Sequence, residues 1–79
     1  MTFAERLKQL RKLEDLSQSQ LADKIGIADS TISAYEMDRF TPSVLILCCF
    51  ADYFHVTTDY LLGRSEESNV QPAIHKLTK

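Results

Sequence analysis

The chain has few of the residues that interrupt regular structure. Its 79 residues include two glycines, two prolines and no tryptophan. The rest of the composition, 44% hydrophobic and 25% charged, is that of an ordinary globular protein and excludes disorder along the whole length. A chain this short supports one small core, because small domains bury a smaller share of their surface. We therefore expect a single compact domain.

Cysteine and long apolar runs are scarce as well. The two cysteines, Cys48 and Cys49, are adjacent, which fits neither a disulfide framework nor a C-x-x-C zinc site. The longest apolar run, 44–51, is far shorter than the roughly 20 residues that span a bilayer. The opening residues MTFAERLKQLRK alternate charged and apolar side chains, unlike a signal peptide. We expect a cytoplasmic protein, off the membrane, whose cysteines are thiols.

Residues that could support catalysis are few. The sequence has no glycine-rich loop for phosphate binding, and its candidate nucleophiles or metal ligands are Cys48, Cys49, His55 and His75. Three of them lie in or next to one apolar segment, where the cysteines are better explained as small core or interface side chains. We predict that the protein is not an enzyme and has no metal site and no cofactor. A redox sensor at Cys49 is the alternative.

Apolar spacing and short capping patterns divide the chain into five helices. A Thr-x-x-Glu capping box at Thr2 opens the first helix, over about 3–13. A Ser-x-x-Gln box at Ser17 opens the second, which ends at Gly26. The third should run over about 29–37, with Ala28 at or near its cap. A serine or aspartate is a better cap than alanine, so Asp29 or Ser30 is the alternative.

The last two helices are expected to begin at threonines. Thr41 followed by Pro42 predicts a fourth helix with Pro42 at its first position, continuing to about residue 54. Thr57 caps a short fifth helix over 58–62, and Gly63 ends it. Strand signals are nearly absent, so the predicted fold is all-α.

The two ends of the chain differ in composition, which predicts the domain organisation. Residues 1–63 hold all five helices and form the expected domain. Residues 64–79 are polar and interrupted by Pro72, and we expect a loose C-terminal tail or linker.

The third helix separates into two faces when its residues are placed on a helical wheel. Ile32 defines the inward direction, and Ala28, Tyr35 and Glu36 lie close to it. The outward face is small and polar: Ser30, Ser33, Ala34 and Met37, flanked by Asp29 and Thr31. A two-helix unit whose second helix shows short hydroxyl side chains to solvent suits the major groove of DNA.

An ordered set of residues extends this pattern along most of the chain: Arg11, Gln18, Leu21, Ala22, Gly26, Ile27, Ile32, Glu36, Pro42, Ala51 and the closing TTDYLLG. With these residues, the segment 2–63 resembles the Xre/Cro family of helix-turn-helix DNA-binding domains, which includes the phage lambda repressor. The resemblance implies a compact five-helix domain whose second and third helices form the helix-turn-helix. It also implies a sequence-specific transcriptional regulator that binds double-stranded DNA, and we expect a repressor.

The resemblance also suggests which residues hold the backbone of DNA. Ser17 and Gln18 start the second helix, where backbone N–H groups and the helix dipole favour a phosphate. Arg39 and Phe40 lie in the loop after the third helix, which touches the DNA backbone in the family. Asp38 stands where many relatives have glycine, so its φ is expected to be positive. The basic side chains of the first helix are expected to form a solvated face, with an approach to DNA as the alternative: Arg6, Lys8 and Lys12.

Arg11 and Glu36 match a pair that bridges the first and third helices in the family. We predict the same salt bridge here, which would fix the third helix against the scaffold and keep Glu36 away from DNA. Two separately solvated side chains are the alternative.

The residues expected to contact bases are Ser30, Thr31, Ser33 and Ala34, together with Asp29. Hydroxyl groups can bond to bases or phosphates, and the methyl groups of Thr31 and Ala34 suit thymine, so we expect an A·T-rich site. Asp29 departs from the commoner family pattern. It could cap the helix, accept a hydrogen bond from a cytosine amino group or repel the backbone, and we favour capping.

The fourth helix has more apolar residues than its core face requires. The core face is expected to hold Val44, Leu47, Phe50, Ala51 and Phe54. The partly exposed residues, which would form a homodimer surface, are Leu45, Ile46, Cys49 and Tyr53. In the alternative, the tail covers this face with Val70, Ile74 and Leu77. A homodimer would read an inverted repeat with half-sites about 34 Å apart.

A second function class is a helix-turn-helix module that binds a protein, as an antitoxin or the partner of a regulator, with weak DNA binding. The net charge of −2, Asp29 and the apolar fourth helix favour it. Against it stand Gln18, Arg39 and the small polar face of the third helix, where a protein-binding helix would carry aromatic anchors. Net charge says little when charges are unevenly distributed, so DNA binding is the preferred interpretation.

Overall fold

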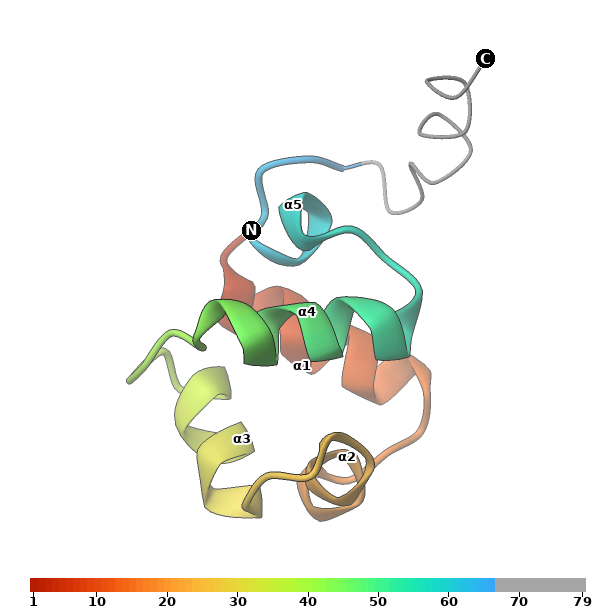
Figure 1. The fold of residues 1–79 in the computed structure, drawn as a ribbon, viewed down its shortest axis with the longest axis vertical. Helices are drawn as coiled ribbons and strands as arrows, with labels where there is room; N and C mark the ends of the chain where they lie inside the picture. Colours follow the sequence, from red (N-terminus) through yellow and green to blue (C-terminus); the bar gives the residue numbers. More distant parts are fainter. Residues whose placement is uncertain (67–79) are drawn as a thin grey trace.

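The computed structural model describes residues 1–66, which form a bundle of five helices without a strand in that range (Figure 1). The helices are α1 (Phe3–Leu13), α2 (Gln18–Ile25), α3 (Asp29–Glu36), α4 (Val44–Phe54) and α5 (Thr58–Leu61). The all-α prediction is confirmed. The third and fifth helices end one residue earlier than expected, a difference within the fraying of helix ends. The alternative in which Val70, Ile74 and Leu77 of the tail cover α4 lies outside the described residues, as does most of the expected tail 64–79.

The capping patterns of α1 and α2 form as the sequence predicts. Thr2 Oγ1 accepts from the backbone N–H of Glu5 at 3.2 Å, and Glu5 Oε1 accepts from the N–H of Thr2 at 2.9 Å. Ser17 and Gln20 repeat the exchange at 3.0 and 2.8 Å. Each box satisfies two N–H groups that have no partner inside the helix, so both helix starts are fixed locally.

The start of α4 differs from the prediction. Ser43, rather than Thr41, is the N-cap, and its hydroxyl accepts from the N–H of Ile46 at 3.2 Å. The helix therefore begins at Val44, and Pro42 remains in the loop. Serine is a slightly better cap than threonine, and the later start leaves a longer loop between α3 and α4.

Three aromatic rings from different helices form the centre of the core. Phe3 of α1, Tyr35 of α3 and Phe50 of α4 lie with ring centroids 6.0 to 6.1 Å apart, at tilted or edge-to-face angles. Such pairs add to the stabilisation from buried area. Because one ring comes from α3, this cluster fixes α3 against the rest of the bundle.

Arg6 is buried, which corrects the expectation of a solvated side chain. Only 1% of it is exposed, and its guanidinium carbon lies 3.6 Å from the centroid of the Tyr60 ring in α5. Its Nη2 is 3.2 Å from Oε1 of the exposed Glu66, and its Nε donates to the Met1 sulfur at 3.0 Å. A planar guanidinium stacks well on an aromatic face, so arginine is tolerated here where lysine would be less suitable. This contact joins α1 to α5.

Gly63 closes the domain next to its N-terminus. Its φ is +78°, and a Cβ at this position would lie 1.8 Å from the carbonyl oxygen of Met1. Only glycine fits this close approach of two backbone segments. Within residues 1–66, no helix is long and apolar enough to cross a membrane.

Candidate nucleic-acid interface

The turn between α2 and α3 is built around Gly26. Its φ of 90° is left-handed, and its N–H donates to Ala22 O at 2.8 Å. Ile27 donates to the same carbonyl at 3.0 Å. The side chains between the two helices are buried, with Leu21 and Ile32 fully so and Ala22 2% exposed. A small residue at position 22 allows the close crossing that a helix-turn-helix requires.

The outward face of α3 is close to the one that the wheel predicts. Ile32 and Tyr35 are buried, and the side chain of Glu36 is 2% exposed. Among the residues expected to contact bases, Asp29 and Ser30 are exposed, whereas Thr31, Ser33 and Ala34 are half-buried. Ala28 is exposed rather than inward-facing, because it precedes the helix as its N-cap. The structure thus brings small polar side chains together on one open face.

Asp29 does not cap α3, which corrects the favoured interpretation. The N-cap is Ala28, and no side chain makes a capping hydrogen bond there. The N-cap is the residue that precedes the first helical residue. Asp29 is itself the first residue of α3, so it is not the N-cap. Its negative charge still interacts favourably with the positive end of the helix dipole.

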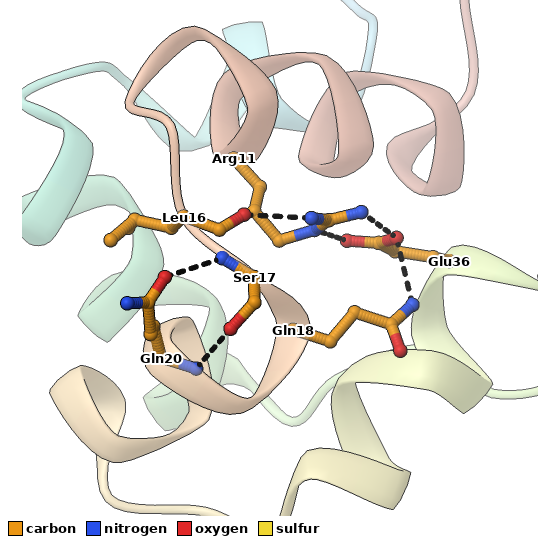
Figure 2. Close-up of polar contacts among 6 residues, drawn as sticks. All are labelled: Arg11, Leu16, Ser17, Gln18, Gln20 and Glu36. Atoms are coloured by element: carbon orange, nitrogen blue, oxygen red, sulfur yellow. Dashed lines mark hydrogen bonds and ion pairs between the residues drawn. The ribbon is translucent and has the colours of Figure 1, made fainter.

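Arg11 and Glu36 form the ion pair expected from the sequence. Arg11 Nε lies 2.7 Å from Glu36 Oε2, and Nη2 lies 3.0 Å from Oε1 (Figure 2). The side chains are 11% and 2% exposed, so the pair is mostly shielded from water. The hydrogen bonds that Arg11 donates to Glu36, and then the negative charge of Glu36, raise the pKa of Arg11. Arg11 Nη1 also donates to Leu16 O at 2.8 Å, which ties the loop before α2 to the same guanidinium.

Gln18 joins this network, a contact that sequence reasoning did not predict. Its Nε2 donates to Glu36 Oε1 at 3.1 Å, while the amide oxygen points away from Glu36 in Figure 2. Glu36 therefore accepts hydrogen bonds from both α1 and α2. The one hint in the sequence is that Arg11, Gln18 and Glu36 all belong to the family pattern. Spacing alone does not reveal that they share one carboxylate.

The other residues expected near phosphates lie at two places. The hydroxyl of Ser17 caps α2 by accepting from the N–H of Gln20, a role that leaves its own O–H as a donor. Asp38, in the loop after α3, has the expected positive φ, 60°. The N–H of Arg39 donates to Ala34 O at 2.9 Å, which fixes the loop against α3. Arg39 and Phe40 are exposed, Phe40 to 62%.

The surface of α4 agrees with the expected partial exposure but corrects one residue of the expected core face. Leu45 and Cys49 are exposed, and Ile46 and Tyr53 are half-buried and also pack against the core. Val44, expected in the core, is 76% exposed, close to the 78% of Leu45. Val44 is the first residue of α4, at the edge of the bundle. We define the α4 outer face by the exposed residues Val44, Leu45, Cys48 and Cys49.

Comparison with known proteins gives the family of this domain. A family model described as a helix-turn-helix matches residues 7–61. The chain belongs to the lambda repressor-like helix-turn-helix family. The two helices of the motif are α2 and α3, as the sequence resemblance implies.

Several curated relatives of this helix-turn-helix domain are bacterial regulators. The chain is 41% identical over 68 residues to the HTH-type transcriptional regulator AnsR of Bacillus subtilis, covering 86% of this chain and 59% of that protein. It is 40% identical over 65 residues to the uncharacterized HTH-type transcriptional regulator YobD of the same organism, covering 82% and 58%. The chain thus spans less than two thirds of the length of these relatives.

Solved structures share the fold. The P22 c2 repressor, in a crystal structure with a synthetic operator, superposes with a TM-score of 0.77 at 25% identity, covering 82% of this chain and 98% of that one. The N-terminal DNA-binding domain of SinR from Bacillus subtilis gives 0.69 at 33% identity, covering 75% and 87%. The five-helix repressor-like architecture is therefore confirmed.

Proposed function

We propose that this domain is a sequence-specific DNA-binding regulator of transcription that places α3 in the major groove. The observation that carries the proposal is the outward face of α3, small and polar, on a helix held from behind by Ile32, Tyr35 and the Arg11–Glu36 pair. A rigid helix with short side chains can approach base edges closely. We further propose that it acts as a repressor on an inverted-repeat operator.

The acidic composition is compatible with this function because one acid of the motif is internal. Glu36 is 2% exposed in its side chain and paired with Arg11, so it presents no free charge to a phosphate. Attraction to the DNA backbone then comes from local features. These are the N-terminus of α2 with Ser17 and Gln18, and the exposed loop residues Arg39 and Phe40.

Base recognition is assigned to α3. Asp29 and Ser30 occupy its first turn and are exposed, and Thr31, Ser33 and Ala34 continue the same side. No arginine or lysine lies on α3 to pair with guanine, so we propose an A·T-rich site with modest discrimination at each position.

A dimer would supply the affinity that one half-site lacks. The α4 outer face offers an apolar surface at which two copies could meet, with Leu45 and Cys49 retained from the expected set. Two copies related by a two-fold axis would place their α3 helices about one helical turn of DNA apart, or about 34 Å.

Selection from a randomised duplex library at low salt, followed by a salt titration of the best duplex, tests the proposal. We expect an enriched inverted repeat. The logarithm of its affinity should fall linearly with the logarithm of the salt concentration, with a slope close to one for each phosphate contact. No enrichment with folded protein would overturn DNA recognition as the function.

A protein-interaction module is the second candidate, because apolar side chains are exposed at one end of α4. Val44, Leu45 and Phe40 are each more than half exposed. A protein partner binding there, while the chain selects no duplex, would favour this function over the first.

A further inference from the structure

We propose that Glu36 is a positioning residue for DNA binding: its hydrogen bond to Gln18 holds the side-chain amide at the start of α2 in the orientation that meets a phosphate. This inference rests on the proposed function. Its basis is the Glu36 carboxylate, which accepts hydrogen bonds from Arg11 of α1 and from Gln18 of α2 (Figure 2). In this role Glu36 touches no DNA itself.

The position of the Glu36 carboxylate is fixed by Arg11. The two bonds from Nε and Nη2 bind both carboxylate oxygens in a fork, a geometry that restricts rotation as well as distance. The Glu36 side chain is 2% exposed, so water does not compete strongly for it. Its Oε1 therefore stands at a defined place beside α2, at which Gln18 Nε2 binds at 3.1 Å.

The chemistry of the two groups sets the orientation of the Gln18 amide. A glutamine amide has two N–H donors and one oxygen acceptor, whereas an ionised carboxylate only accepts. Glu36 consequently selects the amide orientation with Nε2 towards itself. One N–H is used, and the second N–H stays available for an anion, next to the backbone N–H groups of the first turn of α2.

Holding the Gln18 amide in place before DNA binds lowers the entropic cost of binding. A free glutamine side chain loses rotamer freedom when a phosphate immobilises it, and a contact already present in the unbound protein removes part of that loss. The Arg11 charge also neutralises Glu36, so the carboxylate behind Gln18 does not repel the phosphate in front of it.

A double-mutant cycle on the selected duplex tests the inference with Gln18→Ala, Glu36→Gln and the two combined. The readouts are affinity and its salt dependence, at a temperature where circular dichroism shows every variant folded. We expect Glu36→Gln to weaken binding several-fold, as Gln18→Ala does, with little change in the salt slope because the Gln18 amide carries no charge. In the chain that already carries Gln18→Ala, Glu36→Gln should have little further effect.

The control is Glu14→Gln, the same chemical change at an exposed residue after α1. It should leave the affinity nearly unchanged, which separates positioning from net charge. If Glu36→Gln melts too easily, Glu36→Asp replaces it. The shorter acid keeps a charge for Arg11 but draws the carboxylate back from Gln18, and the same loss of affinity is expected.

The possible outcomes separate this inference from the proposed function. A wild-type chain that selects no duplex would overturn the proposed function. A wild-type chain that binds its duplex, while Glu36→Gln leaves the affinity intact or weakens binding equally with and without Gln18, would overturn the positioning role alone.

Discussion

The guanidinium carbon of Arg6 lies 3.6 Å from the centroid of the Tyr60 ring, so a buried cation joins the first helix to the last. We expect Tyr60→Leu to lower the free energy of unfolding by about 1–3 kcal/mol, because a desolvated arginine loses its aromatic partner. Tyr60→Phe keeps the ring and should change stability little. Urea unfolding of both variants checks this, and equal losses would show that the ring is not what matters.

Removing one partner of the Arg11–Glu36 pair should destabilise the fold more than replacing both partners by apolar residues. Arg11→Met leaves a mostly buried carboxylate unpaired, with an expected loss of about 3–5 kcal/mol. Adding Glu36→Leu should recover a large part of that loss, because both charges are then gone. Thermal unfolding of the single and double variants measures the recovery. A double variant as unstable as the single one would contradict this account.

The capping box of α1 predicts a dependence on pH. The backbone hydrogen bond with Thr2 lowers the pKa of Glu5 below its ordinary value of 4.5. A lowered folded-state pKa contributes stability above the unfolded value, and that contribution is lost as pH falls through the folded value. Glu5→Gln keeps an acceptor for Thr2 but does not titrate. Wild type should therefore lose more stability than this variant between about pH 5 and pH 3, as measured by urea unfolding.

Asp29 should influence which base is preferred at one position of the site. Its exposed carboxylate only accepts hydrogen bonds, so it favours the amino group of cytosine over the acceptors of guanine. We expect Asp29→Asn to shift that preference towards adenine, with a change of about 1–3 kcal/mol in discrimination. Asp23→Asn, an equal change of charge at an exposed residue of α2, is the control. Library selection with wild type and with each variant measures the preferred base. An identical consensus from wild type, Asp29→Asn and Asp23→Asn would exclude base reading by Asp29.

The α4 outer face should control assembly without affecting the fold. Leu45 is 78% exposed, so Leu45→Lys should leave the melting temperature nearly unchanged while weakening the proposed dimer and its binding to a full operator. Leu13→Lys, at a residue 71% exposed on α1, is the matched control. Sedimentation velocity with and without the duplex measures both. Equal effects of the two substitutions would argue against a dimer at this face.

The local features of this fold could be predicted from the sequence, whereas contacts between helices could not. Two capping boxes and Gly26 depend on residues a few positions apart, and the structure forms them as expected. The start of α4 was missed because two hydroxyl residues, Thr41 and Ser43, compete as caps two positions apart.

Two of the tertiary contacts were missed for a different reason. Burial of Arg6 depends on a ring more than fifty positions along the chain, and the hydrogen bond from Gln18 depends on where α3 ends relative to α2. A helical wheel gives the face of one helix that points inward, but it does not identify the residues of other helices that pack against that face. The Arg11–Glu36 pair was predicted through the family resemblance, not through spacing.

The close approach of Gly63 to Met1 has a consequence for what can be attached to this domain. The N-terminus and the chain after α5 lie beside each other, at the end of the molecule away from α2 and α3 (Figure 1). A fluorescent label, an affinity tag or a second folded unit joined at Met1 or directly after Gly63 would therefore project away from the proposed DNA face.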